Sequence, residues 1–102
     1  MKNLSREIDP ALIRVTKEAL KANAVFSATF ILVETAADIS PERVALEVHK
    51  LVAVAEKSVS SKASRVVVFK RMASFAVEGP ANLIHEITQS SKIQCATLNK
   101  GP

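Results

Sequence analysis

Apolar side chains recur along this chain with two different periods, and each period predicts one kind of element. Val44, Val48 and Val52 repeat every four positions, which is the spacing of residues on one face of a helix. Elsewhere Val, Ile, Phe and Thr form nearly continuous runs, which are typical of strands. The pattern therefore predicts an α+β protein, with helices over about residues 10–23, 41–58 and 80–91 and strands over residues 25–35, 65–77 and 93–98.

Three prolines mark where the predicted helices begin. Pro10 follows Asp9 and Pro41 follows Ser40, so each proline stands at the first helical position behind a residue type that caps helix N-termini. Pro80 follows a glycine, which is a weaker cap. Together with the apolar spacing, these prolines predict the starts of all three helices.

The apolar run over residues 65–77 is too long for a typical strand, and its interpretation decides the fold. We divide it near Lys70 and Arg71 into two antiparallel strands, although no Gly or Asn marks a two-residue turn there. The elements after the first helix then follow the order βαββαβ, so we expect a ferredoxin-like sheet preceded by an extra N-terminal helix. The alternative is one bent strand, which gives a three-stranded sheet with alternating helices.

Length, apolar content and cysteine count limit the class of protein. With 102 residues, of which 48% are hydrophobic, the chain is expected to form a single domain over residues 1–102, with flexible ends at residues 1–8 and 99–102. No run approaches the roughly 18 apolar residues of a membrane span, and the N-terminus has no apolar signal segment. A single cysteine, Cys95, cannot form an intramolecular disulfide. We therefore expect a cytoplasmic protein that has no contact with a membrane.

The chemistry of an enzyme or of a metal site finds little support in the sequence. Gly79 and Gly101 are the only glycines, so no glycine-rich phosphate loop can form, and no nucleophile or zinc motif is present. Cys95 with His49 or His85 is the one conceivable pair of nucleophile and base, although a lone strand cysteine is more often a small buried apolar residue. We expect no catalytic, cofactor-binding or metal-binding residues.

Positive charge is concentrated in one window. The formal net charge is +4, and outside residues 50–71 acidic and basic residues nearly balance. Inside these bounds Glu56 is the only acidic residue. The basic residues of the same range, which we call the basic window, are Lys50, Lys57, Lys62, Arg65, Lys70 and Arg71. Such a cluster is typical of proteins that contact nucleic acid phosphates. The alternative interpretation is an ordinary solvated surface, which has the same composition. Sequence-independent nucleic acid binding through the basic window is therefore one hypothesis.

The predicted sheet has apolar side chains on both faces. Side chains alternate between the two faces along a strand, and in residues 25–33 both alternating sets are largely apolar. The second and third predicted helices cover one face and the first covers roughly half of the other, so apolar area should remain exposed. We expect that area to bind a protein partner or a second copy of the chain, through Phe30, Val67, Phe69 and Phe75.

These observations leave three hypotheses of function. The first is a non-enzymatic binding or assembly module that acts through its β-sheet and a basic face, as a homo-oligomer or as a subunit of a larger complex. The second is nucleic acid binding through the basic window. The third is a small-molecule-sensing regulatory domain, for which the glycines of a ligand loop are missing.

Overall fold

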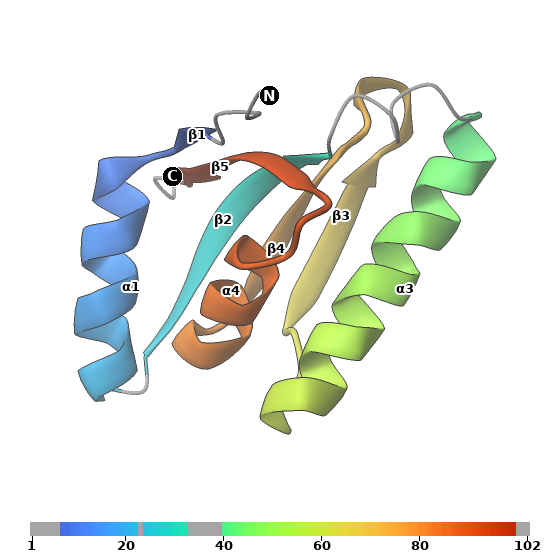
Figure 1. The fold of residues 1–102 in the computed structure, drawn as a ribbon. Helices are drawn as coiled ribbons and strands as arrows, with labels where there is room; N and C mark the ends of the chain where they lie inside the picture. Colours follow the sequence, from blue (N-terminus) through green and yellow to red (C-terminus); the bar gives the residue numbers. More distant parts are fainter. Residues whose placement is uncertain (1–6, 23, 33–39, 100–102) are drawn as a thin grey trace.

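The computed structural model describes residues 7–22, 24–32 and 40–99 and shows an α+β protein, as the apolar pattern predicts (Figure 1). The predicted positions that fall on residues 23 and 33–35 lie outside the described residues. In chain order the elements are β1 (Glu7–Ile8), α1 (Pro10–Ala22), β2 (Val25–Leu32), α3 (Pro41–Val59), β3 (Arg65–Phe69), the 3-10 turn η1 (Lys70–Met72), β4 (Ser74–Pro80), α4 (Ala81–Thr88) and β5 (Ile93–Leu98).

The strands form one sheet in the order β1-β5-β2-β4-β3. β5, β2, β4 and β3 are antiparallel to their neighbours, and β1 adds a short parallel strand beside β5. The run over residues 65–77 therefore contains two paired strands, which confirms its predicted division and shows that the three-stranded alternative is wrong. The fold is not strictly a ferredoxin-like βαββαβ unit, because α1 and β1 precede the four antiparallel strands.

The turn between β3 and β4 explains why no glycine or asparagine marks it. Lys70–Met72 form one turn of 3-10 helix, and Ala73 then takes a left-handed conformation with φ 47° and ψ 43°. A buried alanine thus reverses the chain at a steric cost that glycine would avoid. The reversal is longer than a two-residue hairpin turn, for which Asn and Gly are the usual signal.

All three helices lie on one face of the sheet, with α4 between α1 and α3 (Figure 1). Leu12 of α1, Val48 of α3 and Ile84 of α4 belong to a single core cluster together with one face of the sheet. The expectation that the first helix covers the opposite face is wrong, because α1 packs beside α4 and β5. In the part of the chain that the structure describes, no helix covers the second face, which we call the open face.

Polar caps begin two helices as the sequence predicts. Ser40 Oγ accepts a hydrogen bond from the Arg43 amide at the start of α3, at 3.4 Å, and Asp9 Oδ1 accepts one from the Ala11 amide at the start of α1, at 3.0 Å. The other carboxylate oxygen of Asp9 accepts a bond from the Leu98 amide at 3.4 Å. Asp9 therefore caps α1 and ties it to the end of the sheet.

The third helix and the chain ends differ from the prediction. α4 ends at Thr88 instead of near residue 91, and Ser90 Oγ accepts a hydrogen bond from the Lys92 amide at 3.2 Å, which favours a turn there. Residues 7 and 8, which we expected to be flexible, form β1, and the Asn99 amide donates to the Ser27 carbonyl at 3.0 Å. No helix among the described residues is long and apolar enough to cross a membrane.

Ser60, at the end of α3, has a strained backbone that glycine would relax. Its φ of 57° and ψ of 37° are left-handed, a conformation that costs most L-residues about 1 kcal/mol and glycine almost nothing. We expect Ser60→Gly to raise the free energy of unfolding by roughly 0.5 kcal/mol, because the larger entropy of glycine in the unfolded chain offsets part of the relief. Urea denaturation followed by far-ultraviolet circular dichroism measures the change.

Ser58→Gly is the matched control for this prediction. Ser58 lies inside the last turn of α3, where glycine is unfavourable by about 0.5 to 1 kcal/mol. The two substitutions should therefore have opposite signs. If both destabilised the protein, the end of α3 would not lie between residues 58 and 60.

Candidate functional site

The open face brings together side chains from four strands. Strand register places residues directly opposite one another across β5, β2, β4 and β3. Because opposite residues share a face, they form rows across the sheet. The three rows on the open face are Cys95, Ile31, Ser74 and Phe69; Thr97, Thr29, Ala76 and Val67; and Ser27, Glu78 and Arg65.

The first row is the most apolar part of the open face. Ile31 and Phe69 are each 42% exposed, although both are large apolar side chains. Ser74 lies between them on β4 and is buried, since a larger side chain stands on either side. Val67 and Ala76 of the second row are half-buried and extend this area. The apolar part of the open face therefore reaches the outer edge of the sheet at β3.

A hydrogen-bonded cluster occupies the β2 and β5 side of the same face. Thr29 Oγ1 donates to Asn99 Oδ1 at 2.6 Å, and Asn99 Nδ2 donates to Ser27 Oγ at 2.9 Å. Together with the bond from the Asn99 amide to the Ser27 carbonyl, these contacts fasten the residue after β5 to β2. The cluster keeps the polar end of the open face ordered.

The structure separates the four predicted interface residues into two pairs. Val67 and Phe69 lie on the open face, as an interface requires. Phe30 and Phe75 lie on the helix side of the sheet, where both are completely buried and their rings stack with centroids 5.2 Å apart and an interplanar angle of 28°. These two side chains therefore belong to the core, and Ile31 takes their place on the open face. Ser27 and Thr29 lie on the same face of β2 as Ile31 and alternate with buried Ala28 and Phe30. These two hydroxyl side chains were the signal in the sequence for the open face.

The structure divides the basic window between the two ends of β3. All six side chains are exposed. Lys57 and Lys62 line one surface hollow at the end of α3, and Arg65 begins β3 shortly after it. Lys70 and Arg71 lie in η1, beyond the other end of a strand that is about 17 Å long. The basic window is therefore not one compact cluster.

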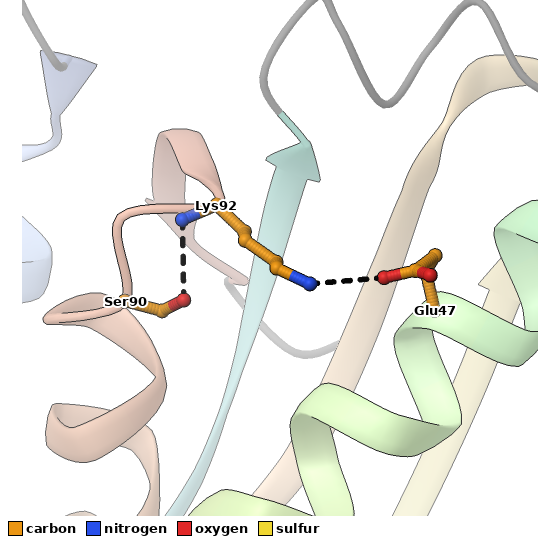
Figure 2. Close-up of polar contacts among 3 residues, drawn as sticks. All are labelled: Glu47, Ser90 and Lys92. Atoms are coloured by element: carbon orange, nitrogen blue, oxygen red, sulfur yellow. Dashed lines mark hydrogen bonds and ion pairs between the residues drawn. The ribbon is translucent and has the colours of Figure 1, made fainter.

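The sixth basic residue, Lys50, lines a groove of about 290 Å³ between α3 and α4. Val54 contributes an apolar wall, and Lys92 lines the same groove from the turn after α4. The Lys92 ammonium donates to Glu47 Oε1 at 3.0 Å, and the backbone amide of Lys92 donates to Ser90 Oγ (Figure 2). This hydrogen bond and the positive charge of Lys92 hold the pKa of Glu47 below its ordinary value. The pair links the turn after α4 to α3, and an exposed ion pair of this kind contributes little to stability.

The structure does not bring together the thiol and imidazole groups considered from the sequence. Cys95 shares the open face with Ile31, whereas His49 and His85 are exposed on helices of the opposite layer. Within residues 7–22, 24–32 and 40–99, no group of three or more His, Cys, Asp or Glu side chains is placed to hold a metal ion. The open face is therefore the surface that the arrangement of side chains favours as a functional site.

Comparison of the chain with known proteins assigns no role to this surface. No model of a protein family matches the chain, and no curated protein and no solved structure matches it either.

Proposed function

We propose that this protein is a non-enzymatic assembly module that binds a second copy of itself through its sheet. The observation that carries the proposal is the apolar area on the open face, formed by the exposed side chains of Ile31 and Phe69 and by half-buried Val67. A solvated face of an antiparallel sheet usually carries polar residues in alternation, and contiguous exposed apolar area on a protein usually marks an interface. Burial of this area against another protein surface would stabilise the assembly.

The proposal includes a ferredoxin-like scaffold for residues after β1 and α1. From β2 to β5 the elements follow the order βαββαβ, and the strand order β5-β2-β4-β3 leaves β3 at one edge. The helices then occupy one layer, which leaves the open face and the β3 edge for contacts. The fold supports many functions, so the proposal rests on the side chains of the open face and not on the scaffold.

Nucleic acid binding is the second candidate, and the exposure of the whole basic window favours it. Phosphate contacts need cationic side chains that are free to reach the backbone. Against this candidate stands the separation of Lys57, Lys62 and Arg65 from Lys70 and Arg71 by the length of β3. A single strand of nucleic acid would have to follow β3 to contact both groups.

Sedimentation velocity over a series of concentrations tests the proposed self-assembly. We expect the parent protein to form a dimer and Val67→Glu to be a folded monomer, because Val67 lies on the open face and a carboxylate there cannot be buried in an apolar contact without a partner charge. Ile13→Glu is the matched control, since Ile13 is 44% exposed on α1, away from the sheet. A parent protein that stays monomeric up to near-millimolar concentration, or a folded Val67→Glu variant that remains dimeric, would refute the proposal.

A further inference from the structure

We infer that the second copy pairs with the outer edge of β3, antiparallel, about a two-fold axis that passes through Val67. This inference rests on the proposed self-assembly and names the strand and register that carry it. It follows from the composition of the sheet edge, from the direction of its backbone groups and from the flank of α3 above it.

The two edges of the sheet differ in how they are protected. β1 forms one edge and has only two residues, and very short edge strands are a common protection against pairing with other chains. β3 forms the other edge with the sequence Arg-Val-Val-Val-Phe. After Arg65 it has no charged residue, no proline and no bulge in its register with β4. Among the described residues, nothing pairs with the outer side of β3.

Hydrogen bonds of the neighbouring strands show which backbone groups of β3 point outward. The Leu32 amide donates to the Ala73 carbonyl at 2.9 Å, so alternate residues of β4 from Ala73 onward direct their backbone groups toward β2. The intervening residues direct theirs toward β3, and the Glu78 carbonyl accordingly accepts a bond from the Ser64 amide at 2.7 Å.

The register between β3 and β4 completes this assignment. Arg65, Val67 and Phe69 stand opposite the β4 residues that point toward β3, so their N–H and C=O groups are used within the sheet. Val66 and Val68 alternate with them and direct their N–H and C=O groups outward. These two residues are the donors and acceptors that a further strand can use.

With a two-fold axis through Val67, the two copies of β3 overlap over their full length. The outward N–H and C=O groups of Val66 and Val68 then all form hydrogen bonds with the second copy. It places Val66 opposite Val68 of the second copy, as a hydrogen-bonded pair, and repeats that pair on the other side of the axis. An axis through Val66 or through Val68 also pairs outward groups, but it overlaps only part of β3. The axis through Val68 in addition sets Arg65 opposite Arg71 of the second copy, which brings like charges together.

The side chains in this register complement their own copies. On the open face Val67 contacts Val67 of the second copy, and the Arg65 guanidinium lies beside the ring of Phe69 of the second copy, which is a favourable cation–π arrangement. On the helix side, Val66 and Val68 of the two copies continue the row of valines. Phe69, which is exposed in the single chain, and Val67, which is half-buried, are both partly covered by their open-face neighbours in the second copy.

The flank of α3 above this edge supports a second copy independently of β3. Glu47 contacts Lys92, and Ser58 contacts Glu86. The flank of α3 that carries Glu47 and Ser58 therefore lies toward α4. The opposite flank lies on the side of β3, where Glu56 accepts a hydrogen bond from the Ala63 amide in the connection to that strand. In Figure 1, α3 is the outermost helix on this side of the molecule.

The residues of this flank fit close contact with another helix. By helical spacing the flank contains Ala45, His49 and Ala53, and Leu46 beside it is 63% exposed. Pairing of the β3 edges would bring this flank to face the same flank of the second copy. Small side chains let two helices approach closely, and Leu46 would then be removed from water.

Disulfide trapping tests the register. In a Cys95→Ser background, Val67→Cys should form a disulfide-linked dimer in oxidised glutathione, because two residues on the axis form a pair with Cα atoms about 4.5 Å apart, within the range of a disulfide. Arg65→Cys alone and Phe69→Cys alone should form no disulfide-linked dimer, because each cysteine would lie about 13 Å from its own copy. A mixture of these two variants should form the mixed disulfide.

The outcomes separate this inference from the proposed self-assembly. A parent dimer in sedimentation with no disulfide in Val67→Cys would overturn the edge register and leave self-assembly through another part of the sheet in place. Equal cross-linking of all three single variants would overturn the register as well, since it would reflect random collision. A monomeric parent would overturn both. The register would be established if Val67→Cys and the mixture cross-link rapidly while Arg65→Cys and Phe69→Cys, each by itself, do not.

Discussion

Replacing Phe75 by alanine is expected to destabilise the protein by about 3 to 5 kcal/mol, which is a large part of the roughly 5 to 15 kcal/mol that stabilises a small domain. Phe75 is completely buried on β4, which has a strand on either side, and its ring stacks on Phe30. The substitution removes that contact and leaves a cavity between the sheet and the helix layer. Urea denaturation followed by circular dichroism is the measurement, because the chain has no Trp or Tyr whose fluorescence could report unfolding.

Phe69→Ala is the matched control for this prediction. Phe69 is the same residue type on the neighbouring strand, but it is on the open face and partly exposed. In the single chain its loss should cost no more than about 1 kcal/mol, as is usual away from a core. Comparable losses for Phe75→Ala and Phe69→Ala would mean that the two faces of the sheet have been assigned incorrectly.

The second large effect is expected for Val68→Glu, which should destabilise the protein by roughly 3 kcal/mol, at the upper end of ordinary single substitutions. Val68 stands opposite Phe75 and packs against the core from the helix side of β3. A carboxylate there would be taken from water without a partner charge. The loss of far-ultraviolet circular dichroism at neutral pH, with partial recovery at acid pH where the carboxyl is neutral, would identify this cause.

Phe69→Glu is the companion measurement, because it places the same charge one residue later on the opposite face. Its side chain points to solvent in the single chain, so the variant should keep the circular dichroism of the parent protein. An unfolded Phe69→Glu together with a folded Val68→Glu would contradict the register of β3. Two unfolded variants would mean that the open face is covered.

The starts of the helices were predictable because they depend on local chemistry. Asp9 and Ser40 act on the N–H groups of the next turn, and both caps are present in the structure. The division of residues 65–77 depends on strand length, which the sequence also contains. The end of α4 at Thr88 was less accessible, since Ser90 and its neighbours are compatible with a helix and with a turn.

The faces of the sheet were harder to predict, because both sets of alternating residues contain apolar side chains. Ala28, Phe30 and Leu32 alternate along β2, and all three are buried. Which face the helices cover depends on the combined packing of three helices, and the pattern of apolar residues alone does not contain that information. Thr29 and Ser27 mark the open face of β2, and these two hydroxyl groups were the signal in the sequence that Phe30 lies on the other face, whereas the face of Phe69 follows from the register of β3 with β4.

The pairing of β1 with β5 also bears on how the protein forms during synthesis. Glu7 stands opposite Cys95, and the neighbours of β2 in the sheet, β4 and β5, both follow it in the chain. Ribosomes add about 5 to 20 residues per second, so α1 and β2 would wait roughly 3 to 13 seconds until β5 has been synthesised. During that interval their apolar faces, including Leu12 and Phe30, have no native surface to cover them. The sheet can therefore close only when nearly all of the described chain has left the ribosome, and until then the nascent chain is a target for chaperones that bind apolar segments.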